Sequence, residues 1–315
     1  MKIKNLIPIK YNDNFNLKNK NKIKKKYTII ANCQGLVLQQ FLQTNNFFII
    51  EYDFIKLNPI QLISKEEIDN FYKIIDKLDL LIIQPIEDNY KNYYKYSTKS
   101  ILKNIRKDCK VIMFPSIYFT GYYPNIFHDY IKEINIIVHD INIIKKFIHS
   151  KDKETFIKDC IDIINDPNFY SKEFINNNIN TSLNELENRE TNANKRFNPT
   201  NFIKISNFIR ENYKNKILFL SLNHQNKYIF RYICDKILEI LLVQKVNYPE
   251  KLDPQLRGVS CIIYKSVINT INKDLKKKIF SQRELPSVDL KTFLEFHYDK
   301  YSKVKDYLIE TYVQK

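Results

Sequence analysis

The chain has 315 residues, of which 44% are hydrophobic, and a formal net charge of +16. This length can bury a substantial core, and no stretch approaches 18 uncharged apolar residues, so we expect no transmembrane helix. The N-terminus lacks the continuous apolar core of a signal peptide. Five scattered cysteines without CxxC spacing predict free thiols and exclude a disulfide framework. We therefore expect a protein of the cytoplasm, with no bound metal.

The positive charge is concentrated at the start of the chain. Residues 1–26 hold nine lysines against the single acidic residue Asp13. Such a segment predicts a solvated, partly disordered arm, and an anionic membrane surface at the inner face is the alternative that its charge favours. No RNA-binding signature or helix-turn-helix pattern follows, so we do not expect nucleic acid as a partner.

The predicted elements of the first 125 residues alternate between strands and helices. Strands are expected at 27–31, 47–50, 78–84 and 111–114, and helices from residue 36, at 64–77 and at 97–107. Near-continuous apolar strands separated by helices predict a parallel sheet with helices on both faces, hence an α/β fold.

The rest of the chain is expected to be mainly helical. Helices are predicted within 126–149, 152–165, 169–187, 200–213, 226–243, 261–281 and 290–312, a loop at 188–200, another at 245–258, and a strand at 216–221. The predicted organisation is a basic arm (1–26), an α/β layer (27–125), a helical insertion (126–215), and a returning strand followed by C-terminal helices (216–315).

The junction between the first strand and its helix is the first candidate site. It reads Asn32-Cys33-Gln34-Gly35, and it contains one of only three glycines in the chain. A cysteine at a helix N-terminus meets unpaired N–H groups and the positive end of the helix dipole. We expect this setting to lower the thiol pKa and to form a nucleophile or an oxyanion site. The alternative is a small buried cysteine that packs in a tight turn.

A second candidate is His224, which follows the predicted strand at 216–221 and precedes a helix. If that strand joins the sheet, His224 and Cys33 share one rim and form a nucleophile–base pair, or His224 is the base for a substrate hydroxyl. The alternative is a histidine that caps the helix. The other histidines fall within helical patterns, and we expect them at the surface or in the core.

Two further strand ends carry polar or aromatic groups. Gln84 precedes Pro85 at the end of the third strand, where its amide can bond a substrate or shape the Cys33 turn. Residues 115–124 combine a strand end, a glycine and aromatic rings, which indicates a pocket wall or a packed turn. The candidates there are Ser116, Tyr118, Gly121, Tyr122 and Tyr123. The chain has no GxSxG elbow, no GxGxxG and no Walker loop.

Together, residues 32–35, the Gln84-Pro85 pair, residues 115–124 and the Asn223-His224 pair resemble the WcbI-type polysaccharide biosynthesis proteins, over about residues 27–245. The resemblance implies a capsule-synthesis acetyltransferase that binds coenzyme A. Two positions depart from that pattern. Tyr123 stands where relatives often have histidine, and Gln225 stands where they have proline, a change that we expect mainly to alter how the following helix begins.

The resemblance implies acetyl transfer from acetyl-CoA to a sugar hydroxyl of a glycan. His224 would act as base, and the Cys33 turn with the Gln34 amide would stabilise the oxyanion. Arg210 and Arg231 are candidate cations for the cofactor by position only. The expected site is Cys33, Gln34 and His224 for chemistry, with Asn32, Gly35, Gln84, Ser116, Tyr118, Gly121, Tyr122, Tyr123 and Asn223 for binding. An SGNH-like esterase and a non-catalytic glycan-binding protein remain alternatives.

Overall fold

The computed structural model describes residues 23–249, 252, 258–275, 280–282 and 284–312. The basic arm predicted over 1–26 therefore lies outside the described residues, apart from its last four. Of these, Lys25 and Lys26 are the first two residues of strand β1.

A five-stranded parallel sheet forms the first half of the molecule. Its strands are β1 (Lys25–Ile30), β2 (Tyr52–Phe54), β3 (Leu80–Ile83), β4 (Lys110–Met113) and β7 (Asn201–Phe202), in the order β2-β1-β3-β4-β7. The register pairs Tyr27 with Leu80, and Leu80 in turn with Lys110. The predicted α/β fold with a parallel sheet is confirmed.

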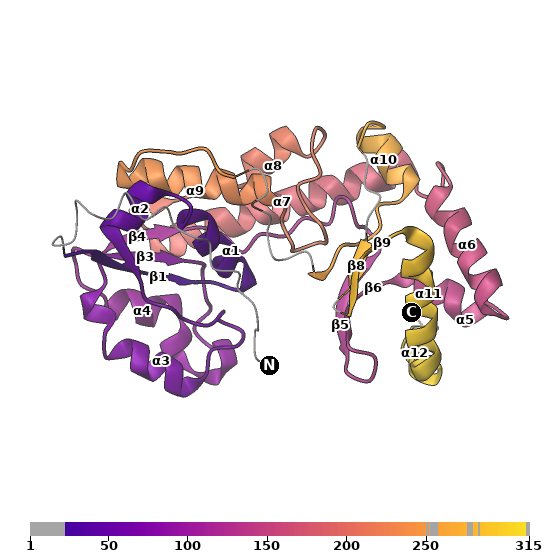
Figure 1. Ribbon diagram of the computed structural model, residues 1–315, viewed down its shortest axis with the longest axis horizontal. Coiled ribbons are helices and arrows are strands. Elements are labelled where there is room, and N and C mark those ends of the chain that lie inside the picture. Colours follow the sequence, from indigo (N-terminus) through magenta and orange to yellow (C-terminus); the bar gives the residue numbers. More distant parts are fainter. Residues whose placement is uncertain (1–22, 250–251, 253–257, 276–279, 283, 313–315) are drawn as a thin grey trace.

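Helices cover both faces of this sheet (Figure 1). One face carries α1 (Cys33–Leu42), α2 (Asn46–Glu51) and α9 (Lys227–Leu241), and the other carries α3 (Lys65–Tyr72) and α4 (Thr98–Asn104). The side chains of β3 alternate between the two faces, as a strand requires: Leu80 and Ile82 pack in one core, Leu81 and Ile83 in the other. Burial on both faces explains why this strand has a continuous apolar sequence.

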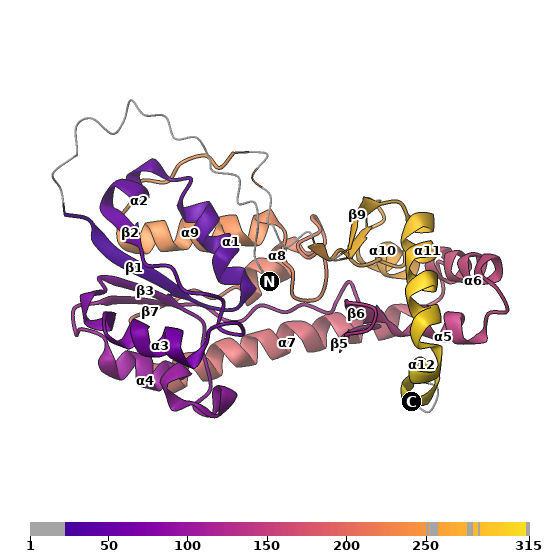
Figure 2. The same cartoon turned by 60° about the horizontal axis from the view of Figure 1, so that its bottom comes forward.

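The second half of the molecule combines a hairpin with helices. Its elements are β5 (Ile126–Ile131), β6 (Ile136–Asp140), α5 (Ile141–His149), α6 (Lys153–Asn165), α10 (Lys265–Ile271), β8 (Phe280–Gln282), β9 (Leu285–Val288), α11 (Leu290–Tyr301) and α12 (Lys305–Tyr312). Short 3-10 turns lie at 75–77, 90–92, 94–96 and 302–304. The long helix α7 (Lys172–Phe197) runs from this part to the sheet, and α8 (Ser206–Asn212) follows it (Figure 2).

Several predicted elements are wrong. The apolar run at 47–50 lies in helix α2, because Asn45 caps it by accepting from the Phe48 amide, 3.0 Å away, and the second strand follows at β2. Short apolar runs do not separate strand from helix by periodicity alone. The stretch 126–140, predicted as helix, is the β5–β6 hairpin, whose turn places Asn135 at a positive φ of 55°.

Three further corrections concern the second half of the chain. The predicted loop at 188–200 is largely the continuation of α7, which ends where Asn198 adopts the left-handed conformation. The predicted strand at 216–221 does not join the sheet. Phe219 instead forms a single bridge with Gln225, so that the segment folds back on itself, and β7 pairs with β4. Helix 261–281 is confined to α10, with β8 beginning at Phe280.

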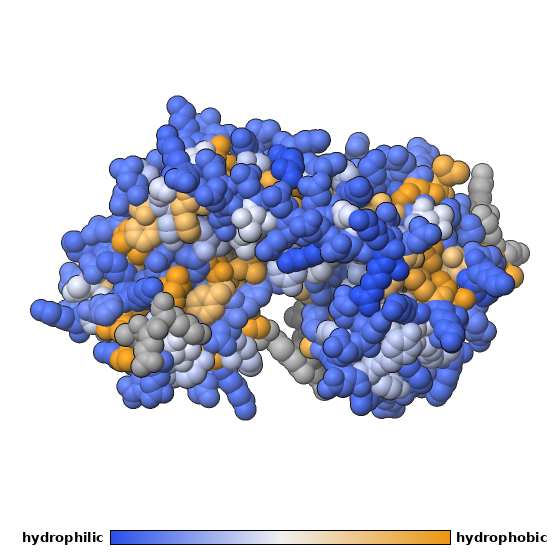
Figure 3. All heavy atoms as spheres, turned by 180° about the vertical axis from the view of Figure 1, so that it is seen from behind, coloured by the Kyte–Doolittle hydropathy of each residue, from blue (hydrophilic) through white to orange (hydrophobic). Residues whose placement is uncertain are grey.

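The face seen in Figure 3 is mainly hydrophilic, with apolar residues gathered in separate areas. Within the described part of the chain, no helix combines the length and apolar character needed to cross a membrane. All five cysteines are free thiols, as predicted, and four of them are buried.

Candidate functional site

The candidate site lies where β1, β3 and β4 end. With the five strands ordered 2-1-3-4-5 along the sheet, the chain leaves β1 and β3 in opposite directions, and in such sheets ligands bind beyond the carboxyl ends of the strands at this point. Asn32 follows β1, Gln84 follows β3, and Ser116 lies shortly after β4. Three of the predicted site residues therefore meet at one edge of the sheet.

Asn32 joins the first and fourth strand ends. Its Oδ1 caps helix α1 by accepting from the Gln34 amide at 2.9 Å, and its Nδ2 donates to Ser116 Oγ at 3.2 Å. The close approach of α1 to β1 depends on Gly35. A Cβ at that position would lie 2.9 Å from Ala31 Cβ and 3.1 Å from Ile29 Cγ2, nearer than ordinary packing allows.

Two buried glutamines hold the strand ends together. Gln84 Oε1 accepts from the Asn32 amide at 3.0 Å, while its Nε2 donates to Gln34 Oε1 at 2.7 Å and to the Pro115 carbonyl at 3.2 Å. Gln34 Nε2 donates to the carbonyls of Ile117 (3.0 Å) and Asn223 (3.2 Å). Both hydrogens of the Gln34 amide are thus directed at backbone carbonyls, which makes Gln34 a residue that organises the site.

The contact from Gln34 brings the Asn223-His224 turn beside the start of α1. The turn is the loop of a tight hairpin, in which the Leu220 amide donates to the His224 carbonyl at 2.7 Å. His224 is half-buried, and the α9 helix that follows it is capped by Asn226. His224 therefore reaches the site from a hairpin, and the prediction that it follows a sheet strand is wrong.

Gln225 belongs to the same set of contacts, which sequence reasoning missed. Its side chain is fully buried, and its Nε2 donates at 2.9 Å to the carbonyl of Ile117 and at 2.9 Å to that of Asn223. Its predicted effect on the start of α9 is not what the structure shows, because Asn226 is the cap. The sequence did hold a signal for this role. The glutamine follows an Asn-His pair directly and precedes a helix that already has its cap.

The thiol of Cys33 is half-buried at the first position of α1. Burial raises the pKa of Cys33 above its ordinary value, and the backbone N–H groups of Cys33 and Gln34 oppose that change without cancelling it. The predicted lowering of this pKa is therefore wrong. Desolvation of the thiolate outweighs the two N–H groups and the helix dipole.

The segment after β4 packs against the hairpin that carries His224. Tyr123 is buried and its hydroxyl donates to the Phe219 carbonyl at 2.8 Å, while the Phe119 amide donates to the Leu222 carbonyl at 2.8 Å. The Tyr122 hydroxyl lies 2.6 and 2.8 Å from the carbonyls of Tyr213 and Lys216. These tyrosines therefore support the hairpin.

The other aromatic candidate and the nearby glycine complete this wall. A Cβ on Gly121 would lie 2.3 Å from Phe119 Cζ, so the turn requires glycine there. Tyr118 is half-buried, and the Arg189 guanidinium from α7 lies 5.3 Å from its ring centroid. A cation–π contact of this kind favours this position of the Tyr118 ring at the edge of the wall.

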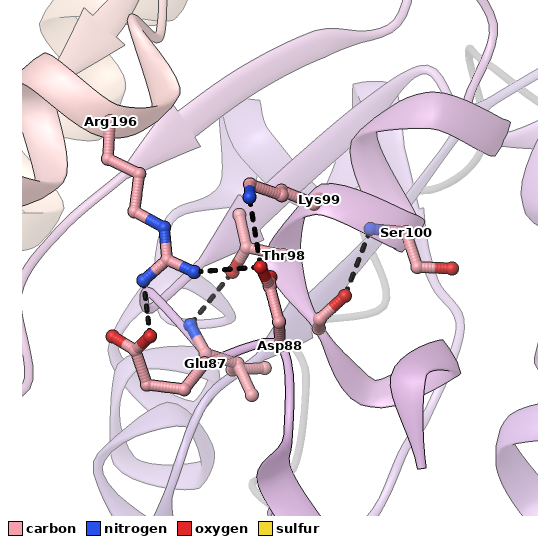
Figure 4. A network of polar contacts seen from close by, with 8 residues as sticks. Glu87, Asp88, Thr98, Lys99, Ser100 and Arg196 are labelled. Carbon is pink, nitrogen blue, oxygen red and sulfur yellow. Dashed lines mark hydrogen bonds and ion pairs between the residues drawn. The ribbon is translucent and has the colours of Figure 1, made fainter.

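Charged groups fix the loop that follows Gln84 (Figure 4). Arg196, near the end of α7, contacts Glu87 and lies 3.1 Å from Asp88, which Lys99 also contacts at 2.9 Å. The Ile86 amide donates to Thr98 Oγ1 at 2.8 Å. The bonds to Lys99 lower the pKa of Asp88, so the carboxylate is ionised at neutral pH and the loop stays attached to α4 and α7.

The structure does not bring the two candidate arginines to this site. Arg210 pairs with Glu187 at 3.2 Å, and Arg231 Nη2 donates to the Pro249 carbonyl at 3.3 Å. The described residues contain no group of three or more His, Cys, Asp or Glu side chains placed to hold a metal ion. The chain thus brings a thiol at the start of α1 and, on the neighbouring turn, a residue with an imidazole, to a set of amides and hydroxyls.

Together, fold and site define a doubly wound α/β protein with polar strand-end loops around a cysteine at a helix N-terminus. The family model described as "Polysaccharide biosynthesis enzyme WcbI" matches residues 26–245. The chain belongs to this family of polysaccharide biosynthesis enzymes, as the motifs at residues 32–35, 84–85, 115–124 and 223–224 predicted.

A solved structure gives the same fold. It is described as WcbI, a polysaccharide biosynthesis enzyme, in a native form without a disulfide bond between coenzyme A and one of its cysteines. The two chains are 20% identical, the TM-score is 0.73, and the match covers 92% of this chain and 96% of the other. A search of the curated proteins found no significant match.

Proposed function

We propose that the protein transfers an acetyl group from acetyl-CoA to a sugar hydroxyl during the synthesis of a surface polysaccharide. The observation that carries the proposal is the bond between Gln34 and the Asn223 carbonyl, which places the His224 turn beside the cysteine at the start of α1. A base and N–H donors at one strand edge are the groups that acyl transfer needs. Membership of a polysaccharide biosynthesis family and the mention of coenzyme A for the similar structure support the choice of donor and acceptor.

In the proposed reaction, His224 removes the proton from the acceptor hydroxyl, whose oxygen attacks the thioester carbonyl. A carbon–oxygen bond forms, the carbon–sulfur bond breaks, and the proton passes to the departing thiolate. The backbone N–H of Cys33 stabilises the oxyanion, an effect of about 3 kcal/mol, since the N–H groups of Gln34 and Gly35 already donate to Asn32. The raised pKa of Cys33 favours this direct route over a covalent acetyl-cysteine, because the thiol is protonated at neutral pH.

The test combines binding with turnover. Purified protein is titrated with acetyl-CoA by calorimetry, and free coenzyme A is then measured with a thiol reagent, with and without candidate sugar acceptors. We expect binding in the wild type and coenzyme A release that requires the acceptor. His224→Ala should bind acetyl-CoA and lose at least about a hundredfold in transfer rate.

The exposed His149 offers the matched control, and His149→Ala should behave as wild type. Absence of acetyl-CoA binding would refute the proposed function. Release of coenzyme A without any acceptor would indicate a hydrolase instead. Mass spectrometry of the protein after mixing with acetyl-CoA decides the route, since an acetyl group on Cys33 would contradict direct transfer.

A further inference from the structure

We propose that Gln225 is a positioning residue for this reaction, which holds the turn that carries His224 against the loop after β4 and contributes little to folding stability. The expected effect on the transfer rate rests on the proposed function, whereas the contacts do not. Four groups make these contacts, and we call them the glutamine clamp: the side-chain amides of Gln34 and Gln225 and the carbonyls of Ile117 and Asn223.

Each amide of the clamp donates to both carbonyls. Gln34 Nε2 lies 3.0 Å from the Ile117 oxygen and 3.2 Å from the Asn223 oxygen, and Gln225 Nε2 lies 2.9 Å from each. One amide comes from α1, and the other comes from the turn that carries His224. The clamp therefore ties three segments, the start of α1, the loop after β4 and the His224 turn, through four bonds.

The other end of the Gln225 side chain distinguishes it from an ordinary core residue. Its Oε1 is buried and accepts no hydrogen bond among the described residues, although the side chain is fully enclosed. Rotating the amide would not help, since it would bring this oxygen against the two carbonyls. An unsatisfied buried acceptor offsets the favourable bonds of the same side chain, so glutamine is a poor choice for stability at this position.

Removal of Gln225 also leaves no new unsatisfied group. The Ile117 and Asn223 carbonyls keep their bonds to Gln34, so an apolar side chain of similar length would cost the fold little. It would, however, release the side-chain tie from the His224 turn to the Ile117 carbonyl, and leave the turn joined to that loop by Gln34 and by the backbone bond from Phe119 to Leu222. Catalytic rates respond to displacements of an ångström or less, which folding stability tolerates.

The decisive variant is Gln225→Met, compared with Gln43→Met at the C-cap of α1 as the matched control. We expect the melting temperature of Gln225→Met to stay within about 2 °C of wild type. The affinity for acetyl-CoA should stay within about twofold, while kcat for transfer falls at least about tenfold. Gln43→Met should match wild type in all three.

A second measurement does not depend on the activity. In protein labelled with carbon-13 histidine, the ring signal of His224 is identified by its absence from His224→Ala. We expect Gln225→Met to move this signal, and to leave the signals of His139 and His297 unchanged. If the wild type transfers no acetyl group, the proposed function is refuted. The His224 signal still shows whether Gln225 positions the turn.

Gln225→Glu provides a partial rescue. The protonated carboxyl group keeps one donor for the clamp, whereas the carboxylate faces two carbonyls with none. Its transfer rate relative to wild type should therefore fall as pH rises. An unchanged kcat and an unmoved His224 signal in Gln225→Met would overturn the proposal, and so would a parallel loss of melting temperature, affinity and rate.

Discussion

At the scale of single residues, the thiol of Cys33 shows how two opposing effects are resolved. The N–H groups at the start of α1 favour a thiolate, but burial disfavours the charge and dominates. We predict that iodoacetamide labels Cys33 slowly at neutral pH and that the rate rises with a midpoint above 9.0, the ordinary pKa. Labelling is followed by mass spectrometry over pH 6–10, and Cys33→Ala should remove the labelled peptide because the other four thiols are buried. A midpoint below pH 8 would show that the helix start dominates instead.

Gly35 lies at a position where its neighbours leave no room for a side chain. We predict that Gly35→Ala lowers the free energy of unfolding by about 1–3 kcal/mol, because the added methyl group meets Ala31 and Ile29 inside the packed interface between α1 and β1. Urea unfolding measures the change. Gly258→Ala is the matched control, since a Cβ there would have no heavy atom of the described residues within 4 Å, and it should change the free energy by less than about 0.5 kcal/mol. Equal effects at both glycines would contradict this account.

At the scale of elements, Gln84 joins the ends of three neighbouring strands. We predict that Gln84→Met lowers the free energy of unfolding by about 2–4 kcal/mol, because it leaves the Asn32 amide and the Pro115 carbonyl without their partner. The exposed Gln61 provides the control, and Gln61→Met should be neutral in the same thermal or urea measurement. Loss of stability without loss of acetyl-CoA binding would separate this role from ligand contact.

The sequence predicted the elements that are buried on both faces, and it did so because their apolar runs are long and bounded. The strands at 27–31, 78–84 and 111–114 lie in the sheet, with the Cys33 junction where periodicity placed it. The sequence analysis mispredicts the runs at 47–50 and 126–140. Asn45 caps the first run as helix α2, and the second run pairs with itself across the turn at Asn135. The apolar spacing of such short runs does not by itself separate strand from helix.

The sequence predicts which residues belong to the site better than it predicts their chemistry. Asn32, Gln34, Gln84 and Ser116 meet in one set of bonds, as strand order predicts. The tie between Gln34 and the turn at 223–225 spans 189 residues of sequence, so the composition of either segment could not reveal it. The pKa of Cys33 depends on how deeply the thiol is buried, which only the folded chain defines.

At the scale of the whole molecule, a single apolar core runs from the sheet into the second half. Phe41 on α1, Phe119 after β4 and Leu294 on α11 belong to one cluster of contacting buried residues. The cluster has no boundary between the two halves of the chain. We therefore expect the described parts to unfold together, and buried charges in the second half to act on the stability of the whole.

Three buried groups in that half contribute to the pH dependence of unfolding. Burial lowers the pKa of His139 and of His297 to about 4 and raises that of Asp140 to about 6. Below pH 6.5 the unfolded histidines bind protons that the folded ones do not, so their contribution to stability is lost as pH falls. Asp140 acts in the opposite sense, because between about pH 4 and 6 its folded carboxyl is protonated while the unfolded one is ionised.

We predict that the free energy of unfolding rises between pH 4 and 6.5, because two histidines oppose one aspartate, each by at most about 1.4 kcal/mol per pH unit. Asp140→Asn should make the rise steeper, and the exposed Asp306→Asn should leave it unchanged. Urea unfolding at pH 4.5, 5.5 and 6.5, followed by circular dichroism, measures the slopes. A flatter profile in Asp140→Asn would contradict the assigned direction.

Helix α7 has a consequence for the insertions and deletions that this chain tolerates. Its 26 residues span about 39 Å, and contacts along its length depend on one continuous helical register. Ser182, near the middle of the helix, meets Thr120, and Arg196, near its C-terminal end, meets Asp88. One extra residue between them turns everything beyond it by about 100°. An alanine inserted after the exposed Asn188 should therefore lower the melting temperature far more than one inserted after Lys132 in the hairpin turn. Natural length variation in this family should then avoid the helix and collect in the turns.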